Sequence, residues 1–425
     1  MGVQTHHRDA PIDPAGSRPS AGVRGTTYQA GGPRSGGASP GGTTYGRPLL
    51  TPPPPLPTRR RRERAPLWAR LCVMFGAVLM LITGGALITS SVLINRYTKS
   101  VNTASLIGDA ETAKKGADGK ALTGALNILL LGVDQRATSD VGNIRSDTII
   151  ILHIPASHDQ AYLVSIPRDS YVDVPADPKT GYGGGKQKIT EAFYYGAQNG
   201  GGREGGAQLV AKTIKQMTGI TFDGAAIIDF GGFKKVIEAL GGVSLCVDHP
   251  VDSIHMRMVN GKPMYVTEAN KFGGGVPVHY KKGCRRFDGW EALDYSRQRY
   301  GLPNGDYDRQ RHQQQLVKAI AKEATSKGIA SDLGKLDRVI KAAGKAFVLD
   351  TGGVPLVDFM FTLKGVAAND LILVRTNAGT FNSAQVGNGE SAEQISDQSL
   401  EMLHAVRDGT LDTWLINHPN YVSSS

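Results

Sequence analysis

Three uninterrupted apolar segments constrain the fold of this chain more than any other feature. They are "LNILLLGVD" (126–134), "TIIILHI" (148–154) and "QAYLVSI" (160–166). A strand that faces water on one side alternates apolar with polar residues, whereas a strand buried on both faces is apolar throughout. Segments with helical periodicity follow these strands along the chain. The sequence therefore predicts an α/β domain with three layers (α/β/α) around a mixed central sheet.

The later elements are predicted from periodicity and from glycine stops. Predicted strands cover 223–230, 243–248 and 371–376. Predicted helices cover 189–199, 206–219, 232–242, 288–299, 305–325, 332–345 and 353–366, with one more near 391–407.

A polar N-terminal segment precedes a long uncharged run. Residues 1–58 are rich in Gly, Pro, Ser and Thr and bury too little apolar surface to offset the entropy of ordering. The cluster "RRRRER" then precedes 71–95, where about 24 apolar or small residues suffice for the roughly 30 Å of bilayer hydrocarbon. A signal peptide would have a shorter apolar core nearer the N-terminus. Because arginines before a span stay in the cytoplasm, we expect a single-pass cell-membrane protein with a cytoplasmic N-terminus and an extracytoplasmic domain.

This topology also accounts for the charge and divides the chain. Much of the excess in the net charge of +10 lies in the juxtamembrane arginines, which face anionic lipid, so we expect membrane lipid and no nucleic acid as a partner. The predicted parts are a disordered cytoplasmic tail (1–65), a transmembrane helix (66–95), a polar stalk (96–122), a catalytic domain (123–345) and a helix-and-strand extension of that domain (346–425).

Charged residues collect where the three apolar strands begin or end. Asp134 ends the first strand, Arg145 and Asp147 precede or begin the second, and Arg168 follows the third through Pro167. If the first and third strands are parallel and the second is antiparallel to them, all these charges share one sheet edge. Two aspartates beside arginines suit an oxygen-ligated Mg²⁺ and a diphosphate. A surface Arg–Asp pair is the alternative.

In two predicted helices, the face that points toward the core carries polar and charged residues beside its apolar ones. Unpaired buried charge is costly, so such stripes must open onto a polar pocket unless they form a structural Arg–Asp network. The positions at i, i+3 and i+7 are Trp290, Leu293 and Arg297 in the first helix and Asp306, Arg309 and Gln313 in the second.

Other signatures are missing from the sequence or are ambiguous. No GxSxG, HExxH or paired CxxC occurs, and "GGGKQK" lacks the spacing of a phosphate-binding loop. Of the three cysteines, Cys72 lies in the uncharged run, whereas Cys246 and Cys284 lie beyond it. These two form either an extracytoplasmic disulfide or two unpaired buried thiols.

The motifs together resemble one family. "NILLLGVD", "RSDT", "VSIPRDS", "KITEAFYYG", "IEALGGV" and "ALDYSRQRYGLPNGDYDRQRHQQQ" occur in the order found in LytR-CpsA-Psr cell-wall enzymes, over about residues 126–320. The resemblance implies a glycopolymer ligase that moves a polyprenyl-pyrophosphate-linked glycan onto peptidoglycan. It also implies a hydrophobic groove for the lipid carrier and a Mg²⁺ cofactor.

The same resemblance implies roles for individual residues. Asp134 and Asp147 match metal ligands, Asp306 matches a suggested base, and Gln313 matches a polar ligand of unassigned role. The residues matching the pyrophosphate surroundings are Arg145, Arg168, Lys188, Arg297, Arg299 and Arg309. Catalysis is assigned to Asp306 together with Arg168, Arg297 and Arg299. The chain departs from the family at His312, where an arginine is usual before a glutamine.

Phosphoryl transfer of this kind depends on positioning and charge neutralisation. A peptidoglycan hydroxyl would attack the sugar-linked phosphorus, and polyprenyl phosphate would leave. A polyprenyl-pyrophosphate phosphatase that uses water is an alternative with the same residues. A non-enzymatic envelope sensor or transcriptional attenuator is a third possibility, although residues 1–58 contain no helix-turn-helix pattern.

Overall fold

The structure is a computed structural model. It describes residues 102–112, 124–134, 143–329, 332–354, 371–386 and 390–423. The predicted tail and transmembrane helix lie outside these ranges, as does nearly all of the predicted helix 353–366. Within them, no helix combines the length and apolarity needed to cross a bilayer.

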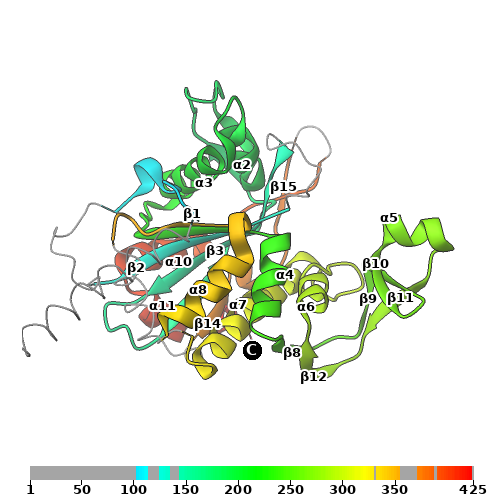
Figure 1. Ribbon diagram of the computed structural model, residues 1–425. Helices are drawn as coiled ribbons and strands as arrows, with labels where there is room; N and C mark the ends of the chain where they lie inside the picture. Colours follow the sequence, from blue (N-terminus) through cyan, green and yellow to red (C-terminus); the bar gives the residue numbers. More distant parts are fainter. Residues whose placement is uncertain are drawn as a thin grey trace, which may run out of the picture. The chain divides into compact units, whose positions relative to one another are not determined.

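A mixed sheet forms the centre of the described part of the chain (Figure 1). Its strands, in spatial order, are β1 (Asn102–Thr103), β13 (Phe347–Asp350), β7 (Gly224–Asp229), β2 (Leu126–Val133), β3 (Ser146–Ile154), β4 (Ala161–Ser165) and β14 (Leu371–Arg375). β3 is antiparallel to both β2 and β4, whereas β7 is parallel to β2 and β14 is parallel to β4. The three apolar segments are therefore the adjacent strands β2, β3 and β4, as predicted.

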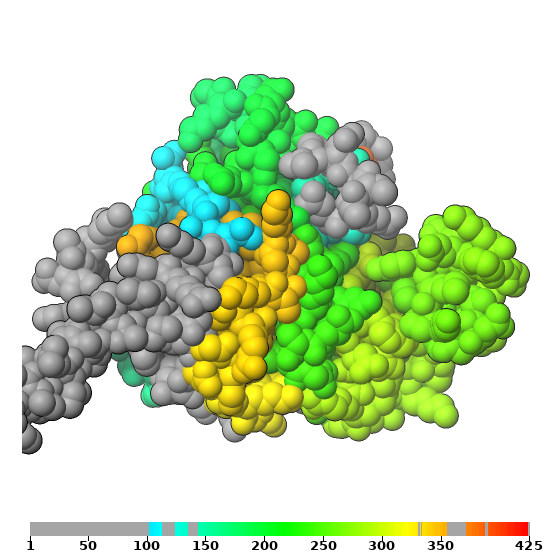
Figure 2. All heavy atoms as spheres, in the orientation of Figure 1, coloured from blue at the N-terminus to red at the C-terminus, as the bar shows by residue number. Residues whose placement is uncertain are grey.

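Helices cover both faces of this sheet. Leu129 and Leu131 of β2 pack in a core with α2 (Ile189–Ala197), α3 (Gly202–Thr218), α10 (Asp397–Asp408) and α11 (Leu411–Asn417). Ile128 and Leu130 face the other side, toward α7 (Asp306–Ser326). Helices α4 (Phe230–Ala239), α6 (Gly289–Tyr295) and α8 (Leu333–Ala343) lie in this second layer, and Figure 2 shows α4 and α8 side by side on its surface. The uninterrupted apolar strands result from this burial on both faces.

An antiparallel extension, which we call the arm (residues 251–280), was not predicted. It contains β9 (Val251–Val259), β10 (Lys262–Tyr265), α5 (Val266–Ala269), η3 (Asn270–Phe272) and β11 (Val276–Tyr280). At its base, β8 (Val243–Val247) pairs with β12 (Gly283–Phe287), and a disulfide joins Cys246 to Cys284. The disulfide alternative for these two cysteines is therefore confirmed. Figure 1 shows the arm extending away from the central sheet.

The remaining short elements are β5 (Tyr171–Val174), β6 (Gly185–Lys188), β15 (Ser383–Ala384), β16 (Ala392–Glu393), η1 (Gly108–Ala110), η5 (Gly344–Ala346), η7 (Thr376–Gly379) and η8 (Pro419–Tyr421).

Three sequence predictions need correction. Residues 102–112, predicted as part of a stalk, instead add strand β1 and bury Leu106 and Ile107 in the core. The C-terminal region contains α10, which begins only at Asp397, and also α11, where a single helix was expected. Helix α6 ends at Tyr295 and does not reach Arg297.

The early end of α6 has a tertiary cause. The side chain of Gln298 folds back to donate to the Asp294 carbonyl, at 2.8 Å, and its own carbonyl accepts from the Ile254 amide of the arm. These bonds hold the chain in a turn after Tyr295. Arg297 therefore reaches the core side from a turn, although the predicted stripe had placed it on a helix.

Candidate functional site

The charged strand ends meet at one edge of the central sheet. Because β3 runs opposite to β2 and β4, its first residues lie beside the last residues of its two neighbours. Asp134, Asp147 and Arg168 are therefore at the same edge, as the strand pattern predicted. The C-terminal end of β7 lies at this edge too, and α4 begins directly after it at Phe230.

A β-bulge places Asp147. Thr148 pairs with Gly132 and Ser146 pairs with Val133, so Asp147 is an extra residue on β3. A Cβ atom at Gly132 would lie only 2.9 Å from the Thr148 Cβ, so glycine permits this close approach. Bulges next to sites redirect side chains, and here the redirected side chain is a carboxylate.

Asp147 is held between two arginines from distant segments. Arg168 Nη1 donates to Asp147 Oδ1 at 2.6 Å. Arg309 Nη2 lies 3.5 Å from the Asp147 backbone carbonyl and pairs with Asp306 at 2.7 Å. The side chain of Arg309 is only 7% exposed. The structure thus brings together Arg168 after β4 and the first turn of α7.

The environment of these arginines is strongly cationic. Burial lowers the pKa of Arg309, and the charges of Arg168 and Arg299 lower it further, against the opposing effect of Asp306. Burial would also lower the pKa of Arg168, but Asp147 and Asp169 outweigh burial and raise it. Arginine keeps its charge throughout the accessible pH range. The site therefore holds several fixed positive charges close together.

Two buried donors of this cluster make no hydrogen bond among the residues that the structure describes, although one of them, Arg168 Nε, lies 3.6 Å from Asp169 Oδ2. They are the Nε–H groups of Arg168 and Arg309. A buried donor without a partner is costly, particularly on a charged group. An anion with several oxygens would satisfy both.

The other predicted arginines lie around this centre. Arg297 Nη2 donates to Asp134 at 3.2 Å, and its guanidinium carbon lies 4.2 Å from the centre of the Phe230 ring. Arg145 pairs with Glu191 at 2.7 Å, and the charge of Asp147 also acts on it.

The remaining two basic residues have peripheral partners. Arg299 donates to the hydroxyl of Tyr300 at 2.8 Å, and its charge acts on Arg309. Lys188 lies 3.6 Å from Glu390.

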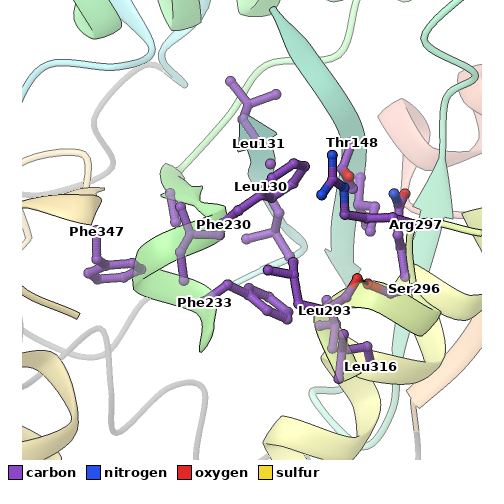
Figure 3. Close-up of a pocket in the computed structure, with 16 residues that line it drawn as sticks. Leu130, Leu131, Thr148, Phe230, Phe233, Leu293, Ser296, Arg297, Leu316 and Phe347 are labelled. Atoms are coloured by element: carbon purple, nitrogen blue, oxygen red, sulfur yellow. Dashed lines mark hydrogen bonds between the residues drawn. The ribbon is translucent and has the colours of Figure 1, made fainter. Parts of the chain in front are cut away.

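A cavity of about 160 Å³ adjoins these charged residues, and we call it the apolar cavity. Its lining comprises Leu130, Leu131, Gly132, Thr148, Ile150, Ala226, Ile228, Phe230, Phe233, Leu293, Ser296, Arg297, Gln313, Leu316, Val317 and Phe347. Figure 3 shows Phe347 and Arg297 on opposite sides of the view, with Phe230, Phe233 and Leu293 between them. Most of these side chains are hydrocarbon, and Arg297 supplies the charge.

The predicted stripe of α7 is confirmed in this cavity. Asp306 and Arg309 lie in the first turns of the helix, and Gln313 and Leu316 line the cavity. A helix that is polar at one end of a stripe and apolar at the other matches a site with a charged part beside an apolar one.

The predicted magnesium ion would depend on the carboxylates of Asp134 and Asp147. No group of three or more His, Cys, Asp or Glu side chains with metal-site geometry occurs among the described residues. Mg²⁺ in phosphate-binding sites needs only one or two carboxylates, because substrate oxygens and waters complete the octahedron. Asp134 and Asp147 follow or begin paired strands and can supply these carboxylates, so the residues fit an ion completed by a phosphate ligand.

His312, the residue at which the chain departs from the family pattern, contacts residues outside this site. Its Nε2 lies 2.9 Å from Asp248 Oδ1 and 3.0 Å from the Tyr295 hydroxyl, and its ring stacks on Tyr295. Arg311 also bonds to Asp248. Burial would raise the pKa of Asp248, but His312 and Arg311 outweigh it and hold that pKa well below its usual range. His312 is thus part of a buried hydrogen-bond network that joins α7 to Tyr295 of α6 and to Asp248.

Sequence reasoning missed the aromatic part of the site. Phe230 and Phe233 line the apolar cavity from the first turn of α4. Their i, i+3 spacing directly after the apolar strand 223–230 was the available signal. Arg145 contacts Glu191 and the ring of Tyr194. In the sequence, these two partners were indicated only as one face of a predicted helix.

Comparisons with known proteins agree with this architecture. The probable cell wall biosynthesis protein LcpB of Corynebacterium glutamicum is 34% identical over 218 residues, which cover 48% of this chain and 44% of LcpB. LcpA of the same species is 27% identical over 314 residues, which cover 68% of this chain and 56% of LcpA. This chain spans about half the length of these two relatives.

A third relative and two solved structures extend the comparison. The polyisoprenyl-teichoic acid–peptidoglycan teichoic acid transferase TagU of Oceanobacillus iheyensis is 29% identical over 65% of this chain and 75% of TagU. The crystal structure of protein gbs0355 from Streptococcus agalactiae matches 68% of this chain and 88% of its own, with a TM-score of 0.53 and 19% identity. That of TagV from B. subtilis matches 68% of this chain and 98% of its own, with a TM-score of 0.50 and 24% identity.

The family model LytR_cpsA_psr matches residues 90–405. This range includes the sheet edge, the arginine cluster, the apolar cavity and the arm described above. The chain belongs to the LytR_cpsA_psr family.

Proposed function

We propose that this protein transfers a glycopolymer from a polyprenyl-diphosphate carrier to peptidoglycan. The observation that carries the proposal is the position of Arg297, which lines the apolar cavity and also pairs with Asp134 at the charged sheet edge. A ligand that fills both regions must join a hydrocarbon to a polyanion. A polyprenyl diphosphate has these two parts in this order.

The diphosphate would take over bonds that the free protein leaves incomplete. Arg168 and Arg309 each have a buried Nε–H that makes no hydrogen bond in the described part of the chain. Guanidinium groups bind phosphate oxygens in pairs, which adds geometric precision to charge attraction. These donors would stabilise the charge that develops on the phosphate oxygens during transfer.

The reaction is a displacement at phosphorus. The oxygen of an acceptor hydroxyl forms a bond to the phosphorus that carries the glycan, and the bond from this phosphorus to the bridging oxygen breaks. Polyprenyl phosphate leaves with the bonding electrons, and the hydroxyl proton passes to a base. No nucleotide is required, because the diphosphate bond that breaks supplies the driving force.

Asp306 remains the proposed base. Its carboxylate pairs with Arg309 at 2.7 Å and accepts from the Gln310 amide at 3.1 Å. When a diphosphate attracts Arg309, Asp306 is released to accept the proton, so substrate binding and base activation would be coupled.

Mg²⁺, if bound by Asp134 and Asp147, would neutralise part of the negative charge on the diphosphate oxygens. Both carboxylates now pair with arginines, at 3.2 Å and 2.6 Å. These arginines would then turn toward the phosphates, to which they are also complementary. Metal and substrate binding are therefore expected to support each other.

Location and substrate class are part of the same proposal. The predicted span over residues 71–95 and the arginines before it support a single-pass anchor with the folded domain on the outer side of the membrane. The disulfide between Cys246 and Cys284 suits an oxidising compartment. The name of the relative TagU describes transfer of a polyisoprenyl-linked polymer to peptidoglycan, which supports the same class of donor and acceptor here.

The test uses the full-length protein in nanodiscs with a synthetic polyprenyl-diphosphate-linked oligosaccharide and soluble peptidoglycan strands. The proposal predicts a phosphodiester-linked glycan on peptidoglycan and one polyprenyl phosphate released per transfer, both detected by mass spectrometry. A reaction in H₂¹⁸O distinguishes the phosphatase alternative. If ¹⁸O enters the glycan phosphate whether or not peptidoglycan is present, the protein is a hydrolase and the ligase proposal is wrong.

A further inference from the structure

A second cavity, of about 220 Å³, lies between the arm and helices α4 and α6, and we call it the arm cavity. Its lining comprises Lys234, Met256, Pro263, Met264, Tyr265, Glu268, Trp290, Leu293, Asp294 and Arg297. The arm supplies about half of these residues, and the layer that carries α4 and α6 supplies the others. Without the arm, this cavity would be open surface.

The arm cavity and the apolar cavity meet at shared side chains. Leu293 and Arg297 line both of them. Arg297 is also the residue that pairs with Asp134 at the charged sheet edge. A ligand in the arm cavity would therefore approach the proposed diphosphate from the side of the arm, whereas the carrier lipid would approach from the cavity between the sheet and helices α4, α6 and α7.

The lining has the chemistry of a carbohydrate site. Trp290 is partly buried against the core, and the ring of Tyr265 is 50% exposed, so both offer flat apolar faces to the C–H face of a sugar ring. Met256 and Met264 are polarizable, adaptable apolar side chains that can contact methyl groups such as those of N-acetyl substituents. Lys234 and Glu268 add a cation and a carboxylate that can bond to hydroxyl, amide and carboxylate groups.

The floor of the arm cavity is fixed by hydrogen bonds. The Asp294 carboxylate accepts from the Tyr280 hydroxyl at 2.7 Å, from Ser253 at 3.0 Å and from Gln298 at 2.9 Å. These bonds tie α6 to the arm. The cavity is therefore formed before a ligand binds, which lowers the entropic cost of binding.

The lining of the arm cavity is balanced in charge, with Lys234 and Arg297 against Glu268 and Asp294, and the excess positive charge lies in the wider segment 251–287. Between residues 251 and 287, seven lysines and arginines face only two aspartates and glutamates, so this segment has a net charge of +5 with neutral histidines. Peptidoglycan is a polymer of N-acetylated amino sugars whose lactyl peptides end in carboxylates. Its N-acetylated sugars therefore match the aromatic and methionine side chains of the arm cavity, and its carboxylates match Lys234.

We propose that the arm cavity binds the peptidoglycan strand that accepts the transferred glycan. This inference rests on the proposed transferase function and adds a location for the acceptor. In a displacement at phosphorus, nucleophile and leaving group lie roughly in line on opposite sides of the phosphorus. On this proposal the acceptor hydroxyl reaches the phosphorus from the arm cavity and the lipid phosphate leaves toward the apolar cavity, and the two cavities meet at Arg297.

The experiment compares two cavity variants with two matched controls in the full-length protein. Tyr265→Ala and Lys234→Ala remove an exposed ring and a cation from the cavity. Phe272→Ala removes another exposed ring of the arm, 65% exposed, that does not line the cavity. Lys235→Ala removes an exposed cation of α4 that does not line the cavity either. The measured quantities are the KM values of donor and acceptor, and the Kd of soluble muropeptide strands by calorimetry without donor.

We expect both cavity variants to raise the acceptor KM and the muropeptide Kd about tenfold, because Tyr265→Ala removes an aromatic anchor of the ligand and Lys234→Ala removes a charged hydrogen-bond donor. The donor KM and both controls should stay within about twofold of the unaltered protein. If muropeptide Kd is unchanged in Tyr265→Ala, or if the donor KM rises in its place, the acceptor assignment is wrong.

These outcomes also separate the inference from the proposed function. If no transfer occurs but muropeptide binding depends on Tyr265, the acceptor site stands and the transferase proposal fails. If transfer proceeds and neither cavity variant alters the acceptor KM or Kd, the transferase proposal stands and the acceptor site fails.

Discussion

Replacing Arg168 by lysine tests the role of its guanidinium group with little change in charge. Arg168 uses Nη1 to bind Asp147 at 2.6 Å, while its buried Nε–H has no hydrogen-bond partner in the described part of the chain. A lysine ammonium can replace the contact with Asp147. It cannot at the same time supply the second, fixed donor that would face a diphosphate oxygen.

The magnitude follows from this one missing bond. A hydrogen bond to a charged group contributes about 1.5–3 kcal/mol, which corresponds to a loss of about 10- to 150-fold in kcat/KM. Stability should change little, because the positive charge is kept and Asp147 keeps a cationic partner. The assay is initial-rate transfer from a polyprenyl-diphosphate donor, with thermal unfolding measured in parallel.

A matched control is Arg286→Lys, since Arg286 pairs with Glu323 on an exposed surface at 2.9 Å. This variant should transfer at the rate of the unaltered protein. If Arg168→Lys also keeps full kcat/KM, its Nε–H does not contact the reacting group. If its loss of rate merely follows a matching loss of folded protein, the contact is structural.

Three further predictions follow from the structure. Asp134→Ala and Asp147→Ala should each raise the Mg²⁺ concentration needed for half-maximal turnover, since removing one of two hard oxygen ligands weakens such a site; an unchanged Mg²⁺ dependence in both would contradict the metal assignment. Replacing Cys246 and Cys284 by serine should lower the free energy of unfolding by about 3–4 kcal/mol, as expected for a loop closed over a sequence separation of 38, and urea denaturation would measure it. Burial raises the pKa of the Glu393 carboxyl above its usual 4.5, so this group favours the folded state fully below pH 4.5 and loses that contribution as the pH rises through its folded pKa; Glu393→Gln should flatten this part of the melting-temperature profile, and an unchanged profile would contradict the shift.

The central sheet was predictable because its strands have an unambiguous sequence pattern. Uninterrupted apolar strands allow burial on both faces only, and the charges at their ends then locate the functional edge. The stripe from Asp306 to Leu316 was similarly clear, since a long helix shows its periodicity over several turns.

Other features depend on contacts that local sequence does not contain. The bulge at Asp147 exists because β2 and β3 pair across Gly132, and α6 ends early because the arm bonds to Gln298. In the arm, strands β10 and β11 are short and mostly exposed, and glycines interrupt the chain before each of them, so this pattern resembles a loop. The arm cavity combines this segment with Lys234 and Trp290 from distant helices, and no single stretch of sequence indicates it.

The ion pairs of the site were also beyond sequence reasoning. Arginines and aspartates were expected near one another, but the pairing of Arg297 with Asp134 and of Arg168 with Asp147 depends on side-chain placement across three segments. In the free site, these two carboxylates therefore hold guanidinium groups that a polyanion would contact.

The most direct test of the account is an experimental structure of the protein with a bound polyprenyl diphosphate. We predict that its phosphate oxygens lie within hydrogen-bonding distance of the Nε atoms of Arg168 and Arg309, and that its hydrocarbon chain fills the apolar cavity beside Phe230 and Phe233. A headgroup bound away from these arginines, or a chain that leaves this cavity empty, would contradict the proposed binding of the lipid carrier.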